Sequence, residues 1–317
     1  MTTLITGAAG FIGAYTARRL AELNQPSVQL DNLNSYYSIE LKHARVAEFA
    51  LQPLVVDVAD SAALMHCFET HRPTRVIHLA AQAGVRHSIE APYDYLHSNL
   101  TGFLNILEAC RRFPVEHLVF ASTSSVYGAQ RETPFREAMS IQTPMSFYAA
   151  TKGANELMAH AYAHLYGIPC TALRFFTVYG AWGRPDMAPI LFSRAILAGR
   201  AIDVFNGGDM LRDFTHVNDI VDGILAALNA PPSKEKPFAV YNLGAGKPVE
   251  LNHFIALIEK MLDKPAIRVL KPMQPGDMRQ TFADTSAARA AFGYEPKMPL
   301  EIGVAELVAW VKSYYKA

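Results

Sequence analysis

Short runs of apolar and β-branched residues recur along most of the chain, and stretches with helical spacing of apolar residues separate them. Most of these runs lack polar alternation, which is typical of strands buried on both faces of a parallel sheet. The stretches 14–23 and 95–112 read as amphipathic helices. The pattern therefore predicts an α/β fold with a doubly wound parallel sheet covered by helices on both sides. The expected strands are 2–6, 28–31, 54–58, 75–80, 117–122, 170–175 and 239–243.

After about Gly180 the pattern loosens, because prolines separate short helices and loops. This change predicts a second, smaller domain toward the C-terminus. The run 239–243 is expected to return to the main sheet, so the two domains should interleave. The expected division gives residues 1–176 and about 211–247 to the sheet domain, and about 177–210 and 248–317 to the smaller one.

Composition and charge exclude several classes of partner. The chain has 317 residues, half of them apolar, and its 29 basic residues balance 29 acidic ones. A net charge of zero provides no overall field for nucleic acid or an anionic membrane, so neither partner is expected. The start of the chain lacks a basic region followed by an apolar one, and no apolar stretch reaches ~18 residues, so we expect a soluble protein. Three widely spaced cysteines at 67, 110 and 170 suggest reduced core thiols and a cytoplasmic location.

A glycine-rich turn follows the first expected strand and opens a helix, with Gly7, Gly10 and Gly13 at its key positions. Glycines there allow a tight turn and a close approach of the backbone to phosphate, while the helix N-terminus adds positive potential. The turn therefore predicts a Rossmann-type dinucleotide site. Asp31 ends the second strand, where a carboxylate accepts hydrogen bonds from ribose hydroxyls and repels a 2′-phosphate, which favours NAD over NADP. Alternatively, Asp31 only begins the following turn.

Tyr148 and Lys152 lie four positions apart, which places both side chains on one face of a helix. There the ammonium group can lower the pKa of the phenol and make it a usable base. The alternative is a solvated pair without chemistry. The order along the chain favours chemistry, because the pair follows both the glycine turn and the hydroxyl cluster Thr123-Ser124-Ser125.

These motifs together resemble the extended short-chain dehydrogenase/reductase family over the whole chain, through 6–13, 78–81, Thr123, Tyr148 and Lys152. The resemblance implies that Tyr148 is the catalytic acid or base, that Lys152 lowers its pKa and holds the nicotinamide ribose, and that Thr123 binds the reacting oxygen. It also implies a tightly bound NAD, regenerated at each turnover. The implied cofactor-binding residues are Gly7, Gly10, Phe11, Ile12, Gly13, Asp31, Asn32, Asp57, Val58, Ala80, Ala81, Gln82, Asn99, Tyr148 and Lys152.

The residues after Thr123 separate the reactions of that family. Members that eliminate water or carbon dioxide commonly carry an acidic side chain there, whereas this chain has Ser124 and Ser125. Removal and return of hydride, that is epimerisation, is therefore the leading expectation, which makes the protein an isomerase.

Residues 174–189 closely resemble the corresponding segment of the UDP-glucuronate 4-epimerases, with Ala181 for the usual proline and His87 for a tyrosine as departures. The resemblance implies a UDP-sugar substrate, UDP-glucuronate interconverting with UDP-galacturonate. Arg184 can pair with the uronate carboxylate, unless it only forms a loop salt bridge, and Arg212 is expected to meet the diphosphate. The implied substrate-binding residues are Arg86, Thr123, Ser124, Ser125, Thr177, Arg184, Met187, Arg212 and Asp277.

Several alternatives stay open at this point. The enzymatic rivals are a UDP-glucuronate decarboxylase and a 4-epimerase acting on UDP-glucose or a UDP-N-acetylhexosamine, and the non-enzymatic rival is an NAD-sensing regulatory protein. His160 and His164 lie one turn apart, but no third ligand stands out, so no metal is expected. The helices expected at 95–112 and 148–166 could pair with a second copy, which suggests a homodimer, or could belong to the core.

Overall fold

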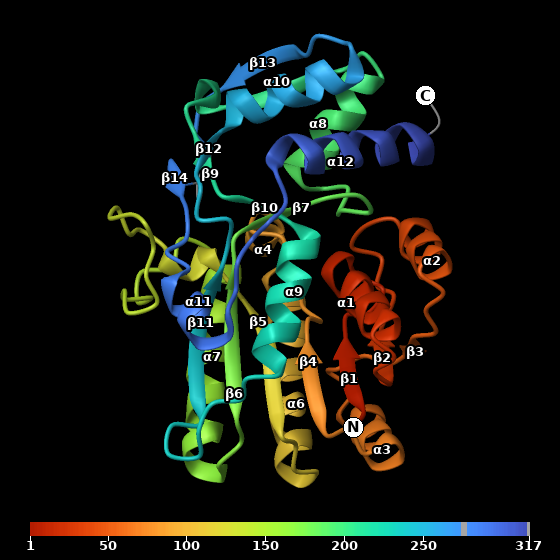
Figure 1. Ribbon diagram of the computed structural model, residues 1–317, viewed down its shortest axis with the longest axis vertical. Helices are drawn as coiled ribbons and strands as arrows, with labels where there is room; N and C mark the ends of the chain where they lie inside the picture. Colours follow the sequence, from red (N-terminus) through yellow and green to blue (C-terminus); the bar gives the residue numbers. More distant parts are fainter. Residues whose placement is uncertain (274–277, 316–317) are drawn as a thin grey trace.

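Seven parallel strands form the central sheet of the larger lobe, in the order β11-β6-β5-β4-β1-β2-β3 (Figure 1). The computed structural model describes residues 1–273 and 278–315. The strand order reverses between β1 and β4, which is the usual ligand-binding point of a doubly wound sheet. The expected fold class is confirmed. The strands are β1 (Thr3–Thr6), β2 (Ser27–Asp31), β3 (Leu54–Val55), β4 (Arg75–His78), β5 (His117–Thr123), β6 (Cys170–Phe175) and β11 (Phe238–Leu243).

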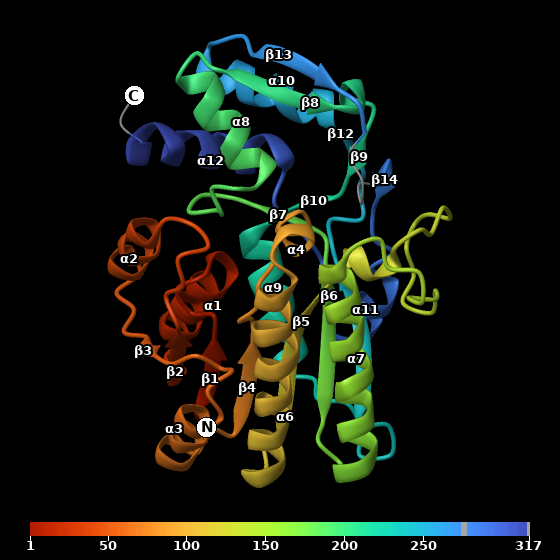
Figure 2. The same cartoon turned by 180° about the vertical axis from the view of Figure 1, so that it is seen from behind.

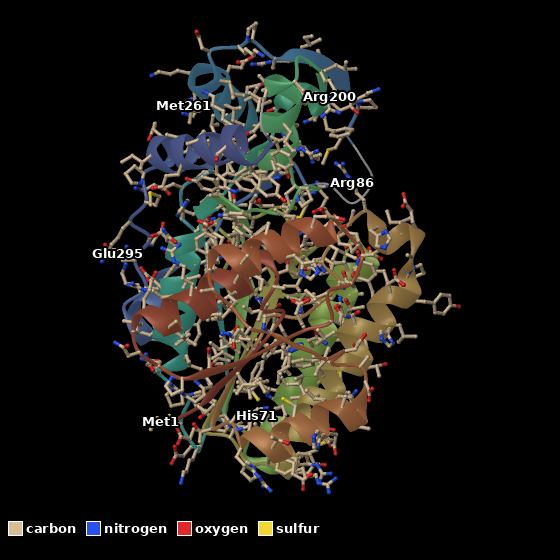
Figure 3. All side chains as sticks on the ribbon, turned by 90° about the vertical axis from the view of Figure 1, so that its right-hand side faces the viewer. Met1, His71, Arg86, Arg200, Met261 and Glu295 are labelled. Atoms are coloured by element: carbon tan, nitrogen blue, oxygen red, sulfur yellow. The ribbon has the colours of Figure 1, made fainter. Side chains whose placement is uncertain are left out.

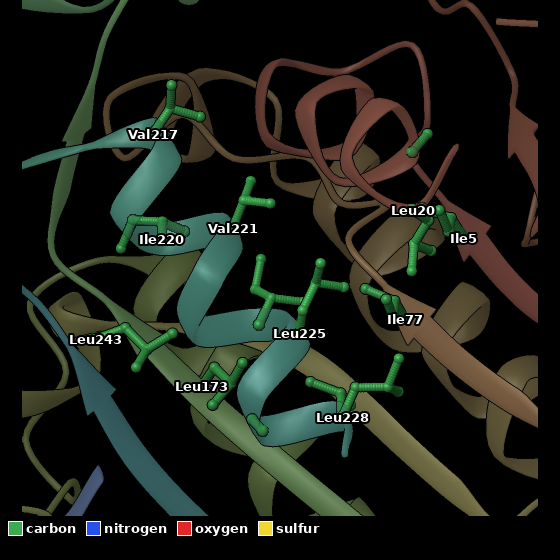
Figure 4. Close-up of a cluster of buried hydrophobic side chains, with 14 of the residues drawn as sticks. Ile5, Leu20, Ile77, Leu173, Val217, Ile220, Val221, Leu225, Leu228 and Leu243 are labelled. Carbon is green, nitrogen blue, oxygen red and sulfur yellow. The ribbon is translucent and has the colours of Figure 1, made fainter. Parts of the chain in front are cut away.

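Helices cover both faces of this sheet. Helices α1 (Phe11–Glu22) and α9 (Val217–Leu228) pack together on one face, where Ile5, Leu173 and Ile220 belong to one buried cluster (Figure 4). The opposite face is covered by α3 (Ser61–His71), α6 (Gly102–Arg112) and α7 (Phe147–Tyr166), as Figure 2 shows. Burial on both faces explains why the central strands lack polar alternation.

The smaller lobe lies above the sheet in Figure 1 and has its own core. There Phe214 stacks on Phe254 with 4.0 Å between ring centroids. Short strands link the lobes, with β7 beside β10 and β9 between β12 and β14. The elements are α8 (Ala188–Leu197), α10 (Leu251–Leu262), α12 (Leu300–Tyr315), β7 (Thr177–Tyr179), β8 (Ala201–Phe205), β9 (Leu211–Arg212), β10 (Phe214–His216), β12 (Val249–Glu250), β13 (Ile267–Lys271), β14 (Gln280–Thr281) and η3 (Asn206–Gly208).

Helix α11 (Ser286–Phe292) packs against β11, and Ala288 and Tyr294 lie in the core under the large sheet. The expected division gave this whole stretch to the smaller domain. We propose to keep that division with one change, which moves α11 to the sheet domain because its apolar side chains are buried there.

Two local expectations need correction. The helix expected over 95–112 is three pieces, α5 (Pro92–Tyr95), the π-helix η1 (Leu96–Thr101) and α6. The wide turn lies where Asn99 points inward and bonds the loop after β4. The strand expected over 54–58 is only two residues long, since β3 is a short edge strand whose two side chains are exposed. The remaining helices are α2 (Ile39–Glu48), α4 (His87–Glu90) and η2 (Ser124–Tyr127).

None of the helices in residues 1–273 and 278–315 combines the length and the apolar character that crossing a lipid bilayer requires.

Candidate active site

One cavity of about 1200 Å³ is lined by residues of both lobes. Its floor is formed by the carboxyl ends of the central strands, and α8, β8 and Arg212 contribute from the smaller lobe. Of the expected site residues that the structure describes, all line this cavity except Asn99. Asp277 lies outside the described residues.

The glycine turn leaves no room for side chains. A Cβ atom on Gly13 would lie 2.0 Å from the carbonyl oxygen of Gly7, and one on Gly7 would lie 2.7 Å from the amide nitrogen of Ala80. Gly7 also has a φ of +72°, which glycine adopts without strain. Gly10 then caps α1 without a side-chain hydrogen bond. The backbone can therefore approach a diphosphate closely at the positive end of α1, as an NAD site requires.

Asp31 is placed for both roles that the sequence left open, the start of the following turn and a carboxylate facing the cofactor site. Its carboxylate accepts hydrogen bonds from the amides of Ala9 (2.9 Å) and Leu33 (2.8 Å), so it does begin the turn. It also lines the cavity at the end of β2. Beside it, Asn32 donates a 3.1 Å bond to Asp57. These contacts hold the carboxylate of Asp31 at the wall of the cavity, where a ribose would meet it.

Hydrogen bonds from the side chains of Thr6 and Asn99 hold the loop after β4 in place. Thr6 Oγ1 accepts a hydrogen bond from the amide of Ala80 at 3.1 Å. The Asn99 side chain accepts from the amide of Gln82 (2.8 Å) and donates to its carbonyl (3.0 Å). Asn99 itself is 1% exposed. The sequence expected Asn99 to touch the cofactor, but the structure places it one layer back, where it supports Gln82.

Tyr148, Lys152 and Thr123 all line the cavity, and the side chains of Tyr148 and Thr123 share a hydrogen bond. Burial raises the pKa of Tyr148, and the hydrogen bond from Thr123 and the charge of Arg184 lower it only in part. Burial also lowers the pKa of Lys152 to about 8, against the opposing charge of Glu156. The net effect on Tyr148 is a raised pKa, because desolvation outweighs the two effects that lower it. The expected influence of Lys152 on this pKa stays a prediction.

Arg184 reaches the cavity from the loop between β7 and α8. It forms an ion pair with Asp186 and donates a 3.2 Å hydrogen bond to the carbonyl oxygen of Ala83. The hydroxyl of Tyr36 donates to the same Asp186 at 3.1 Å. The loop salt bridge that the sequence left open is thus present, and Arg184 also lines the cavity and acts on the pKa of Tyr148.

The other nominated substrate residues surround the same space. Ser124 and Ser125 follow Thr123 at the end of β5, Thr177 begins β7, and Met187 precedes α8. The guanidinium of Arg86 lies 4.7 Å from the ring centroid of Phe205, which belongs to the smaller lobe. Figure 3 shows Arg86 at the level where the lobes meet and Arg200 on the smaller lobe. Arg212 donates to the carbonyl oxygen of Leu211 at 2.9 Å.

The sequence missed further lining residues. Lys42 is buried on α2 and donates to Asn34, and burial lowers its pKa. A charged residue on the apolar face of this helix was the available signal. Phe205 ends β8, where alternation buries Ile202 and Val204 and places Phe205 on the opposite face, so a large aromatic residue at that position was the signal. With these included, the described wall carries an excess of positive charge, which favours anionic ligands. The cations are Lys42, Arg86, Lys152, Arg184, Arg194, Arg200 and Arg212, and the acids are Asp31, Asp57, Asp186 and Asp203.

Comparison with known proteins agrees with this geometry. A model of the NAD dependent epimerase/dehydratase family matches residues 3–244. The chain is 44% identical over 335 residues to a probable UDP-glucuronate 4-epimerase of Rhizobium meliloti, covering 100% of this chain and 98% of that one. It is 42% identical over 333 residues to UDP-glucuronate 4-epimerase 2 of Arabidopsis thaliana, covering 100% and 77%. A crystal structure of the UDP-glucuronic acid 4-epimerase from Bacillus cereus with UDP-glucuronic acid and NAD has a TM-score of 0.92 at 30% identity, covering 99% and 100%.

Proposed function

Because the chain belongs to the NAD dependent epimerase/dehydratase family, we propose that it interconverts UDP-glucuronate and UDP-galacturonate as an NAD-dependent 4-epimerase. The reaction removes hydride from carbon 4, rotates the 4-keto sugar and returns hydride to its other face. The protein is thus an isomerase.

The observation that carries this proposal is the position of Arg184. Arg184 lines the same cavity as Tyr148, and its charge lowers the pKa of the phenol that would take the proton of the hydroxyl group on carbon 4. In a uronate, the carboxylate is attached to the neighbouring carbon 5. Asp186 already accepts hydrogen bonds from Nε and Nη2 of Arg184, so the substrate carboxylate would be bound through the remaining N–H groups at Nη1 and Nη2. A neutral sugar cannot accept such charge-assisted bonds in the same way. The site therefore suits a uronate better than UDP-glucose.

The residues of the chain divide the chemistry among them. Tyr148 takes the proton of the 4-hydroxyl group and later gives it back, while Thr123 hydrogen-bonds the same oxygen. Lys152 lies one helical turn from Tyr148 and is the group that would hold the nicotinamide ribose. Ser124 and Ser125 offer hydroxyls but no carboxylate, which favours hydride return over elimination.

The glycine turn, Asp31 and the loop 80–82 fit a dinucleotide, since the turn has no space for side chains where a diphosphate would lie. Bound NAD accepts the hydride and returns it, and its positive ring favours the ionised form of Tyr148. That added charge offsets the burial that otherwise raises the pKa of Tyr148.

A 4-keto uronate is a β-keto acid and loses carbon dioxide when its carboxylate bond aligns with the carbonyl π system. We propose that Arg184, Thr177 and the three hydroxyls at 123–125 hold the carboxylate out of that alignment. The same residues then separate epimerisation from decarboxylation.

The proposal is tested by incubating the purified protein with UDP-glucuronate, without added NAD, while NMR follows the sugars and absorbance follows NADH. UDP-galacturonate without net NADH supports the proposal. Carbon dioxide with a UDP-pentose means a decarboxylase, and turnover of UDP-glucose or a UDP-N-acetylhexosamine alone means a neutral-sugar epimerase. Binding of NAD without any turnover of these substrates supports the regulatory alternative.

A homodimer is also part of the proposal. Leu104 on α6 and Leu157, Leu165 and Tyr166 on α7 are large apolar side chains with at least two fifths of their surface exposed. Helices α6 and α7 pack side by side, so a second copy could cover both. We expect Leu157→Glu to lower the molar mass measured by light scattering. Leu270→Glu on β13 is the matched control, since both leucines are 68% exposed. Equal masses for both variants would contradict this interface.

A cytoplasmic location completes the proposal. Cys67, Cys110 and Cys170 are free and buried, which suits a reducing compartment. Cell fractionation with a tagged protein tests it, and recovery in an oxidising compartment would contradict it.

A further inference from the structure

Arg45 is a fully buried arginine that the proposed chemistry does not use. It lies on α2 with 0% of its surface exposed. Its guanidinium donates to the carbonyl oxygen of Ala9, to the hydroxyl of Tyr37 at 3.2 Å, and twice to the carbonyl oxygen of Trp182 at 2.7 and 3.1 Å. A buried charge is costly unless it is fully hydrogen-bonded, and the planar guanidinium group can donate to several carbonyl oxygens at once.

Each of the two carbonyls that Arg45 joins belongs to a segment whose neighbouring residues, Gly10 in one and Arg184 in the other, line the cavity. Ala9 lies inside the glycine turn, and its own amide donates to Asp31. Trp182 lies in the loop between β7 and α8, two residues before Arg184. Arg45 is therefore a direct link between the wall of the expected NAD site and the loop that carries the expected carboxylate ligand.

The loop around Trp182 is a tight turn that packs against α12. Trp182 has a φ of +61°, a left-handed conformation that is rare for a large side chain. A Cβ atom on Gly183 would lie 3.1 Å from the carbonyl oxygen of Gly180, so the turn is tight. The indole of Trp182 packs against Trp310 of α12 at 5.3 Å between centroids. A shift of the Trp182 carbonyl must therefore move the backbone that leads into Arg184.

We propose that Arg45 is a positioning residue that couples occupancy of the cofactor site to the placement of Arg184, and hence to uronate binding. The inference rests on the proposed function for the identity of both ligands. Coupling between sites is reciprocal, so a bound uronate must also hold the cofactor more tightly. A residue that served only to stabilise α2 would change protein stability without changing this mutual effect.

The test measures the rate at which NAD leaves the purified holoenzyme, in the presence of UDP-glucuronate or of UDP. UDP lacks the whole glucuronosyl group, so the ratio of the two rates measures the contribution of the sugar with its carboxylate, for which Arg184 is the expected ligand. In the parent protein we expect UDP-glucuronate to slow NAD release at least about fivefold more than UDP does, which is the lower end of typical coupling. In Arg45→Gln the ratio should fall to about one.

Two further variants keep the test decisive. Arg45→Lys retains the charge, but a single ammonium group cannot replace the guanidinium N–H groups that bind the carbonyl oxygens of both Ala9 and Trp182. This variant should therefore give an intermediate ratio even if Arg45→Gln does not fold. Tyr15→Phe removes the 3.1 Å hydrogen bond from Tyr15 to the carbonyl of Ala181 in the same loop, without touching the glycine turn. It should retain the parent ratio.

Each outcome is informative. A parent-like ratio in Arg45→Gln, or in Arg45→Lys when the glutamine variant is unfolded, overturns the inference. So does a ratio of one in a parent protein that epimerises UDP-glucuronate. A parent protein that neither turns over UDP-glucuronate nor responds to it refutes the proposed function instead.

Discussion

Glu156 provides the sharpest test of how the core supports the site. It lies on α7, one turn beyond Lys152, and pairs with Arg174 on β6 through two bonds of 2.7 and 2.9 Å. Both side chains are only 4% exposed, and the hydroxyl of Ser122 also donates to Glu156. Glu156 therefore has two functions, and a single substitution removes both: it neutralises a buried arginine, and its charge raises the pKa of Lys152 against the lowering effect of burial.

The substitution Glu156→Gln leaves Arg174 buried without its counterion. Breaking a buried pair from one side costs about 3–5 kcal/mol in the free energy of unfolding, because the remaining charge is desolvated and unpaired. Arg174 keeps a 3.2 Å hydrogen bond to the carbonyl of Glu137 and its position over the Tyr127 ring, so we expect the lower part of that range. Replacing both partners with leucine should cost less than the single change, because no charge stays behind.

The same substitution should shift the alkaline side of the pH dependence of kcat. The pKa of Lys152 is about 8 with Glu156 charged nearby, and Glu156 raises it. Without that carboxylate the pKa of Lys152 falls further, so the lysine loses its proton at lower pH. The decline of kcat on the alkaline side should therefore begin at lower pH in Glu156→Gln than in the parent.

Urea unfolding with NAD present at a fixed concentration measures the change in the free energy of unfolding. A pH series of kcat measures the pH at which activity declines on the alkaline side. The matched control is Glu22→Gln, which breaks an exposed pair with Arg18 and should change stability by less than about 1 kcal/mol. A loss for Glu156→Gln as small as that of the control, together with an unchanged alkaline limb, would refute the reasoning.

Four further outcomes are expected. Tyr148→Phe should abolish epimerisation while NAD stays bound, as measured by NMR and by NAD released on denaturation; residual turnover near the parent level would contradict the role of the phenol. Arg184→Gln should lower kcat/KM for UDP-glucuronate by about 10²-fold, since a charge-assisted pair contributes up to about 3 kcal/mol, and equal loss with UDP-glucose would argue against uronate recognition. Gly13→Ala should abolish NAD retention because its Cβ meets a carbonyl oxygen at 2.0 Å, whereas Gly153→Ala on α7, with an ordinary 3.7 Å contact, should bind NAD normally. Lys152→Met should raise the Tm of the cofactor-free protein, because the pKa of Lys152 is about 8 instead of the ordinary 10.5, so its charged form lowers the free energy of unfolding by up to about 3 kcal/mol below pH 8. This destabilisation disappears as the pH rises from 8 to 10.5. A gain in Tm from the substitution that did not shrink over that pH range would contradict the reasoning.

The sequence by itself determined the features that depend on local spacing. Runs of β-branched residues predicted the central strands to within a few positions, because burial on both faces demands continuous apolar character. The glycine turn was predictable because Gly7 has a positive φ and a Cβ on Gly13 would meet the carbonyl oxygen of Gly7, and both requirements are local. The placement of Tyr148 and Lys152 one turn apart on a single helix was predictable, because four residues make about one helical turn.

The tertiary structure decided what depends on contacts between distant segments. No local pattern marks Asn99 as a support for Gln82, or Arg45 as a link between Ala9 and Trp182, because each bond joins loops that only the packed sheet brings together. The pKa of Tyr148 is another example, since helical spacing suggested a lowered value and burial raises it. Spacing along the chain specifies which groups can share a face, whereas desolvation and long-range hydrogen bonds exist only once the whole chain has enclosed them.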